Sequence, residues 1–443
     1  MGAGHMIKFA NSILVLFLLL LLCLLAEGIL NYHLHSDSVV SILFYHIFPS
    51  LFIAILIYCL ILKKEYKVNI AISLASIGIC LLVIDMFIWV SLNNEPSYEE
   101  LSKKKNIPFD SRTILEVIES FEKKNVVLNP AVSPYLFINQ NNMEIYPLSG
   151  LSNTLTIFCN ETGEYTIYNS DKYGFHNMEK DIWNPGIAEI GAVGDSFLHG
   201  ACVPTEKNIT STISREYKKT INLGLGGNGP LLELAILKEY MSQLRPKKVL
   251  WFYYEQNDLI DLREEVRNPI LMRYLTQGDY RQNLTDKQSD VDQVCKKYIE
   301  KQKFIKQEPN KLIKIAGFVE NSLKLSNLRL VIYAHLHFVP ENIYTHFQQI
   351  ITEAKRTVES WGGELYFVYL PSFRGYKYNR DYHRFEILGI VERQKVSIID
   401  IHEEFGSVDN PFIYFPYEDC SAHYNELGYK TVAQKVIEHL QAN

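Results

Sequence analysis

Ser196 is the first residue in this sequence whose surroundings suit covalent chemistry. It follows an apolar run at 190–193 that is typical of a buried strand, and it precedes a stretch that fits a helix. A strand-to-helix turn at the carboxyl end of a sheet exposes one side chain beside free backbone N–H groups, so a serine there could act as a nucleophile. The alternative is that Asp195 or Ser196 only caps the next helix, as both residue types do.

Three further motifs carry residues that could complete such a site. The glycines of NLGLGGNGP at 222–230 let the backbone approach a ligand closely and direct an N–H toward it. Asn257 follows an apolar run, where its carboxamide could donate a hydrogen bond to a developing oxyanion. His423 precedes the last helical pattern. Each motif also has an ordinary explanation as a glycine-rich turn, a turn-forming asparagine or a structural histidine.

The elements that must position these residues alternate between strand and helix patterns. The apolar runs that indicate strands lie at 187–193, 220–224, 248–254, 364–370 and 396–401. The helical patterns lie at 206–218, 230–244, 343–361, 381–394 and 425–441. Such alternation predicts a parallel sheet that is covered by helices on both faces. Three of the four motifs then stand at the carboxyl ends of strands, so we expect them to form one site.

Taken together, the four motifs resemble the sequence blocks of the SGNH (GDSL-like) hydrolases. The corresponding residues are Gly194-Asp195-Ser196, Gly227 within the run 222–227, Asn257-Asp258, and His423 with the tail 423–428. The resemblance covers roughly residues 187–441 of a predicted domain at 187–443, which carries an insertion at about 259–342. It implies a three-layer α/β/α sandwich with a parallel sheet, related to flavodoxin. The layout is similar to membrane-anchored, extracytoplasmic members that modify cell-surface glycans.

The resemblance also implies a role for each of these residues. Ser196 would attack an ester carbonyl, and His423 would accept its proton and return it to the leaving alcohol. The backbone N–H groups of Ser196 and Gly227 and the side chain of Asn257 would form the oxyanion hole. Asp258 would fix the loop that carries Asn257.

One position departs from the family pattern. The family places an aspartate three residues before the histidine, and in this sequence that position is Cys420. Asp419 lies four residues before His423, and Glu418 lies five residues before it. We expect Asp419 to orient the imidazole if the loop bulges at 420–422. The alternatives are that Glu418 does so, or that neither carboxylate does.

The amino-terminal region is predicted to lie in a membrane. Residues 1–5 look like a cloning scar, and residues 6–92 contain three apolar segments at 12–30, 39–62 and 68–90, each close to the ~20 residues that cross a bilayer. The loop before the third segment carries three lysines, whereas the loop before the second carries none. Because positive loops stay cytoplasmic, we expect a multi-pass cell-membrane protein whose chain after the third segment lies outside the cytoplasm.

Two further regions connect the membrane segments to the sheet. Residues 93–132 are predicted to form a polar connector with a helix near 112–124, and residues 133–186 an accessory β region of short antiparallel strands. The seven cysteines show no CxxC pair and no zinc-like spacing, so no metal or other cofactor is expected. The net charge of −6 and the lack of a basic stripe argue against nucleic acid as a partner.

These features predict an O-acyl esterase or O-acyltransferase that acts on a cell-surface polysaccharide or glycolipid. Both reactions pass through an acyl-serine, so the motifs do not distinguish them. Three spans are few for carrying an acyl donor across a bilayer, so a transferase would need a multispan membrane partner or an external donor. The alternative is an inactive, membrane-tethered glycan-binding or assembly protein, which the irregular spacing between Asp419 and His423 favours.

Overall fold

The computed structural model describes residues 3–30, 42–93, 96–140, 142–178, 180–186, 188–305, 317, 321–336, 339–380, 382–418 and 420–442. The chain divides into two compact units. The smaller unit comprises Met1–Glu95 and Glu308–Pro340, and the larger comprises Pro96–Gln307 and Glu341–Asn443. The region predicted as an insertion at 259–342 is therefore shared between the two units.

A five-stranded sheet forms the centre of the larger unit. Its strand order is β5-β4-β6-β7-β8, and the paired strands are all parallel. The strands are β4 (Ile190–Val193), β5 (Thr220–Asn222), β6 (Lys248–Tyr254), β7 (Glu364–Leu370) and β8 (Ser397–Asp400). Each lies within, or coincides with, an apolar run found in the sequence, because strands that are buried on both faces need apolar side chains throughout. The prediction of an α/β fold with a parallel sheet is confirmed.

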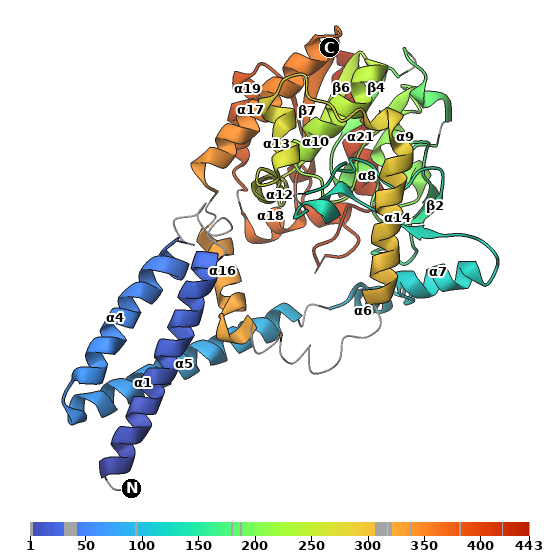
Figure 1. Cartoon of the computed structure of the whole chain (residues 1–443). Coiled ribbons are helices and arrows are strands. Elements are labelled where there is room, and N and C mark those ends of the chain that lie inside the picture. Colours follow the sequence, from blue (N-terminus) through green and yellow to red (C-terminus); the bar gives the residue numbers. More distant parts are fainter. Residues whose placement is uncertain are drawn as a thin grey trace. The chain divides into compact units, whose positions relative to one another are not determined.

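Helices pack against both faces of this sheet (Figure 1). One layer contains α9 (Ile209–Ile213), α20 (Ile401–Gly406) and α21 (Glu426–Ala442). The other contains α10 (Pro230–Ile236), α17 (Glu341–Glu359) and α19 (Arg384–Arg393).

Alternation along β6 supplies both layers with apolar contacts. Phe252 belongs to the core that also contains residues of α9 and α21. The next residue, Tyr253, packs against Phe347 of α17, with 5.5 Å between the ring centroids. Successive side chains of a strand point to opposite faces, so one strand contributes to both cores.

Further helices lie around this framework. They are α8 (Ser196–His199), α11 (Ser242–Leu244), α12 (Asp258–Glu265), α13 (Pro269–Thr276), α14 (Gln288–Ile305) and α18 (Phe373–Tyr378). Of these, α8 follows β4, α12 follows β6 and α18 follows β7, so each begins at the carboxyl edge of the sheet.

A small second sheet precedes the central one. β1 (Asn129–Pro130) pairs in parallel with β2 (Leu155–Ile157), which pairs in antiparallel with β3 (Ile167–Asn169). Residues 135–148 lie within the region predicted to form short antiparallel strands, but those of them that the structure describes contain no strand, and Pro134–Phe137 make a 3₁₀ turn instead. The backbone N–H and carbonyl of Tyr146 bond to the Gln282 side chain, which replaces a neighbouring strand as their partner.

Two helices of the connector begin with the same N-terminal capping motif. α6 (Tyr98–Lys104) and α7 (Ile114–Glu122) both start with a capping box, in which a hydroxyl and a glutamate satisfy the first free N–H groups. The helix that the sequence indicated near 112–124 is present as α7.

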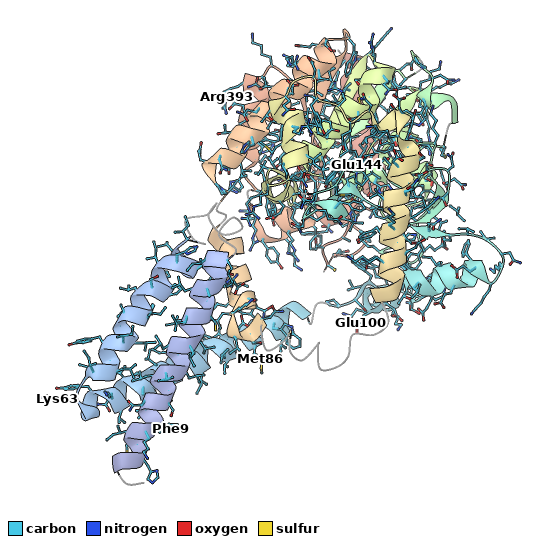
Figure 2. All side chains as sticks on the ribbon, viewed as in Figure 1. Phe9, Lys63, Met86, Glu100, Glu144 and Arg393 are labelled. Carbon is cyan, nitrogen blue, oxygen red and sulfur yellow. A yellow bond between two sulfur atoms is a disulfide. The ribbon has the colours of Figure 1, made fainter. Side chains whose placement is uncertain are left out.

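The smaller unit consists of apolar helices. α1 (Ala3–Leu30) and α5 (Lys64–Asn93) contain the stretches His5–Leu30 and Tyr66–Ser91, which are long and apolar enough to cross a membrane. Side chains such as Phe9 and Met86 project outward from these helices (Figure 2), and more than half of each is exposed.

The second segment predicted to cross the membrane forms a shorter apolar helix than the other two. It appears as a π-helical turn (Leu43–Ile47) followed by α4 (Phe48–Ile61), and its apolar stretch, Tyr45–Ile61, is shorter than the other two. Residues 39–41 of the predicted segment lie outside the described residues. Two candidate spans are therefore found in the described chain, and the third stays a prediction.

α16 (Ser326–Leu336) belongs to the smaller unit although it lies within the predicted insertion. The buried carboxylate of Asp85 in α5 accepts hydrogen bonds from the Leu328 N–H at 2.8 Å and from Asn327 Nδ2 at 3.0 Å. A carboxylate satisfies the free N–H groups of a helix start and suits its positive end. This contact joins the segment to α5.

Candidate active site

Ser196 and His423 meet at the carboxyl edge of the central sheet. Ser196 is the first residue of α8, directly after the turn that follows β4, and His423 lies in the loop before α21. The Ser196 Oγ lies 2.8 Å from His423 Nε2, although 227 positions separate the two residues in sequence. A hydroxyl hydrogen-bonded to a ring nitrogen is the geometry that lets a base activate a serine.

The capping alternative holds for Asp195 and not for its neighbour. The Asp195 Oδ1 accepts the Phe197 N–H at 2.9 Å, which caps α8. Burial raises the pKa of Asp195 to about 6, against the lowering effect of the Phe197 N–H and the nearby His423. Asp195 therefore supplies the cap, and the Ser196 hydroxyl has two acceptors within reach, His423 Nε2 at 2.8 Å and, at the longer distance of 3.4 Å, Asp195 Oδ2.

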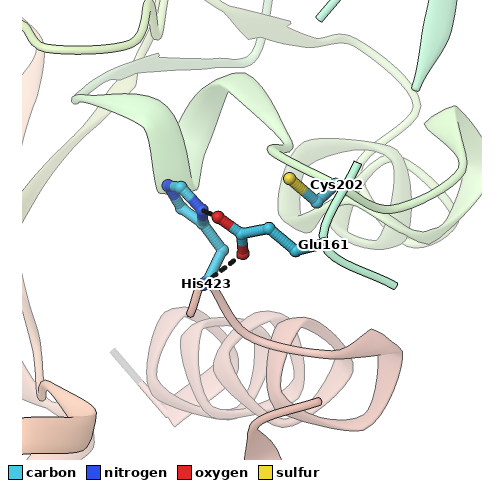
Figure 3. Close-up of side chains that lie close together, drawn as sticks. All are labelled: Glu161, Cys202 and His423. Atoms are coloured by element: carbon cyan, nitrogen blue, oxygen red, sulfur yellow. Dashed lines mark hydrogen bonds and ion pairs between the residues drawn. The ribbon is translucent and has the colours of Figure 1, made fainter. Parts of the chain in front are cut away.

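The acid beside His423 is Glu161, which the sequence analysis did not single out. Its Oε1 lies 2.9 Å from His423 Nδ1, and its Oε2 accepts the backbone N–H of His423 at 2.7 Å (Figure 3). A residue of the accessory region therefore lies beside His423 Nδ1, where Asp419 was expected. Asp419 itself lies outside the described residues. The other alternative, Glu418, is 62% exposed at its side chain and lies 3.9 Å from Lys105 Nζ.

The Glu161 loop is held by covalent and hydrogen bonds. It connects β2 to β3, and a disulfide joins Cys159 to Cys202, which follows α8. Thr162 Oγ1 donates to the Cys202 carbonyl at 2.9 Å. Gly163 has a φ of +115°, and a Cβ there would lie 2.3 Å from the carbonyl oxygen of Pro108. These restraints fix the loop close to the segment that carries Ser196.

The charges of His423 and Glu161 stabilise each other. Burial opposes the imidazolium, but the Glu161 charge and hydrogen bond outweigh it and raise the pKa of His423 above its ordinary value. Burial likewise opposes the carboxylate, but His423 outweighs it and lowers the pKa of Glu161. Nδ1 therefore carries the proton that Glu161 accepts, and Nε2 is free to accept the serine proton.

The connector also contacts this pair. The Tyr98 hydroxyl of α6 donates to the Ser421 carbonyl at 3.0 Å, and its ring stacks on Tyr417 at 6.0 Å between centroids. A hydrogen bond from Tyr98 also contributes to the low pKa of Glu161, after the larger contributions of burial and His423. The first helix of the larger unit thus supports the loop that presents His423.

Glu161, Cys202 and His423 lie close enough together to be considered as metal ligands (Figure 3). The Cys202 sulfur is bonded to Cys159, however, and a metal would need it as a thiolate. Glu161 and His423 are already bonded to each other. These three residues do not fit a metal ion.

Gly227 lies in the glycine turn beside Ser196. A Cβ on the preceding residue, Gly226, would lie 3.7 Å from the Ser196 Cβ, so the turn is adjacent to the hydroxyl. Gly227 itself has a φ of +78°, which favours glycine. Among the described residues, no acceptor is found for its N–H. The assignment of this N–H to the oxyanion hole stays a prediction.

Asn257 stands between β6 and α12, as the sequence indicated. Its Nδ2 donates to Asp261 Oδ2 at 2.7 Å, and a carboxamide nitrogen carries a second hydrogen that this bond does not use. The next residue, Asp258, accepts the Tyr254 N–H at 2.9 Å and so holds the turn. The role of Asn257 as an oxyanion donor also stays a prediction.

No family model and no curated protein matches this chain. Solved structures do match it. A lipase/acylhydrolase from Enterococcus faecalis is 9% identical with a TM-score of 0.32, covering 58% of this chain and 96% of its own. A two-domain esterase active on acetylated mannans is 11% identical with a TM-score of 0.32, covering 58% of this chain and 49% of its own. The structure of TesA is 10% identical with a TM-score of 0.32, covering 57% of this chain and 98% of its own. These likenesses concern the fold alone.

Proposed function

We propose that this chain is a serine O-acyl esterase or O-acyltransferase that acts outside the cytoplasm on a cell-surface polysaccharide or glycolipid. The observation that carries the proposal is the hydrogen-bonded series from Ser196 through His423 to Glu161. A hydroxyl, an imidazole and a carboxylate in this order form a nucleophile, a general base and an orienting acid.

The first half of the reaction forms an acyl-enzyme. Ser196 Oγ attacks the ester carbonyl carbon while His423 Nε2 takes the hydroxyl proton, and the carbonyl oxygen becomes an oxyanion. The N–H groups of Ser196 and Gly227 and the Asn257 carboxamide stabilise that charge. Collapse of the intermediate breaks the ester C–O bond, and His423 returns the proton to the leaving alcohol.

The second half decides between hydrolysis and transfer. Water or an acceptor hydroxyl attacks the acyl-serine, gives its proton to His423 and takes the acyl group, after which Ser196 regains its proton. The intermediate is common to both outcomes. For transfer, a multispan membrane partner would bring the acyl donor to the outer face, and the glycan hydroxyl would be the acceptor.

A fluorophosphonate probe tests the enzymatic proposal directly. We expect the full chain, purified in detergent, to be labelled covalently and to release acetate from an acetylated polysaccharide. Loss of acetyl from the polysaccharide that increases with an added glycan acceptor, with that acetyl recovered on the acceptor and not as free acetate, would assign transfer. Absence of both labelling and release from folded protein would contradict the proposal and leave the glycan-binding alternative.

The localisation rests on three features. Two helices are long and apolar enough to cross a membrane, and the lysine-rich segment at 63–67, where α5 begins, favours a cytoplasmic position for the chain between the last two predicted spans. The disulfide between Cys159 and Cys202 is of the kind that persists in oxidising compartments. These features support a bilayer partner and an extracytoplasmic catalytic unit.

Cysteine labelling in whole cells tests this orientation. We expect Asn94→Cys to react with a membrane-impermeant thiol reagent, because residue 94 follows the last apolar segment on the outer side. Glu65→Cys, in the lysine-rich segment at 63–67, is the matched control and should react only after lysis. The reverse pattern would place the catalytic unit inside the cell and contradict the proposed substrate.

A further inference from the structure

The glycine turn beside Ser196 is held by two side chains that the proposed reaction does not itself require. Ser133 Oγ donates to the carbonyl oxygen of Gly226, and His199 Nδ1 accepts the Gly226 N–H at 3.3 Å. Ser133 precedes the 3₁₀ turn of the accessory region, and His199 is the last residue of α8. The two bonds reach the turn from different parts of the chain.

Together these bonds fix both peptide planes around Gly226. The N–H belongs to the peptide between Leu225 and Gly226, and His199 holds it. The carbonyl belongs to the peptide between Gly226 and Gly227, and Ser133 holds it. In a trans peptide the C=O and N–H point in opposite directions, so the bond from Ser133 also sets the direction of the Gly227 N–H.

The hydrogen bonds of His199 define its protonation. The Gly226 N–H can only donate, so Nδ1 must present a lone pair and the ring proton must sit on Nε2. Nε2 lies 2.7 Å from the Tyr168 hydroxyl, whose oxygen accepts a hydrogen bond from the Nε2–H. Burial, with the charges of His176 and His423, holds the pKa of His199 well below its ordinary value, which keeps the ring in this neutral form.

An aromatic ring also packs against the face of the His199 imidazole. Phe158 stacks on it with 4.2 Å between centroids and 24° between planes. The Phe158 ring lies 3.1 Å from the place where a Cβ of Gly226 would stand, so a side chain at that position would press on the ring. Phe158 directly precedes Cys159, whose disulfide anchors the Glu161 loop. The ring therefore has little freedom to move away from the turn.

We propose that Ser133 and His199 are positioning residues that lock the two peptides flanking Gly226 and so aim the Gly227 N–H at the oxyanion formed on Ser196. The proposal rests on the proposed acyl-transfer function. Neither residue touches the substrate; both act through the backbone. Loss of either bond lets the turn rotate, which weakens the stabilisation of the oxyanion and leaves ground-state binding unchanged.

Kinetics of three variants test the proposal. We expect Ser133→Ala and His199→Phe to lower kcat about 10- to 100-fold with KM little changed, which is less than the ~10²–10³ lost when an oxyanion donor is removed outright. His199→Asn places an amide oxygen near the position of Nδ1, so it should recover most of the rate. Ser152→Ala, which removes a hydroxyl bonded to Asp292 in the same region, is the matched control and should stay near wild type.

The inhibition constant of an alkyl boronic acid separates positioning of the oxyanion hole from a purely structural role of Ser133 and His199, because a purely structural role would leave this constant unchanged. The adduct of the boronic acid with a serine is tetrahedral and places an oxygen in the oxyanion hole. The inhibition constant should therefore rise in the same proportion as kcat/KM falls. Variants with wild-type melting temperatures that keep both kcat and boronate affinity would overturn the proposal, as would a change in KM alone. A wild-type enzyme without turnover would overturn the function itself.

Discussion

Ser196→Ala is expected to lower turnover of an acetyl ester by about 10⁴-fold or more, to the level left by binding and the oxyanion hole alone. Alanine has no hydroxyl to form the acyl-enzyme, and no neighbouring group in the hydrogen-bonded series can replace it. Fluorophosphonate labelling should disappear in the same variant.

The fold should survive this change. The Ser196 hydroxyl bonds His423 at the surface of the site, and Asp195, not Ser196, caps α8. We therefore expect the melting temperature of Ser196→Ala to match that of the wild type, with Ser152→Ala as the control for a lost hydroxyl elsewhere. A variant that keeps full turnover would rule out an acyl-serine intermediate.

Glu161→Gln is expected to lower kcat by about 10³- to 10⁴-fold, with KM little changed. The Glu161 carboxylate accepts two N–H groups, from Nδ1 and from the backbone of His423. A carboxamide has one oxygen, so one of these donors would face its NH₂ group. The imidazole then loses either its orientation or the tautomer that frees Nε2.

The pH dependence of kcat/KM distinguishes Glu161 from the other candidate orienting acids, Asp419 and Glu418. His423 must be neutral to accept the serine proton, so kcat/KM should rise with pH through the elevated pKa of His423. Removing the Glu161 charge removes the main influence that raises this pKa. The acid limb of Glu161→Gln should therefore shift to lower pH while the rate falls.

Asp419→Asn and Glu418→Gln are the matched comparisons for this result. Both remove a carboxylate from the loop before His423, and both should keep near wild-type rates with an unshifted acid limb. If Asp419→Asn instead proved the damaging change and Glu161→Gln were mild, Glu161 would not be the orienting acid.

The sequence by itself determined the strands of the central sheet, and it placed Ser196 and His423 in motifs expected to meet, which the structure brings within 2.8 Å of each other. Strands buried on both faces must be apolar along their length, so β4 to β8 could be located from the residues alone. Ser196 and His423 could be predicted because their motifs are local and stand at predictable ends of strands and helices. Residues 135–148 alternate apolar and polar side chains as a strand does, yet the backbone of Tyr146 pairs with the side chain of Gln282 and not with a neighbouring strand.

Only the tertiary structure decided which acid faces His423. Glu161 lies 262 positions before His423, in the loop between β2 and β3 of the small second sheet. Nothing in the sequence shows where this small sheet packs against the central sheet. The disulfide from Cys159 to Cys202 and the turn at Gly163 set that place. A carboxylate from any segment of the chain can bond His423 Nδ1 if the fold brings it within hydrogen-bond distance and in the right direction. The local sequence around the histidine does not determine that distance or that direction.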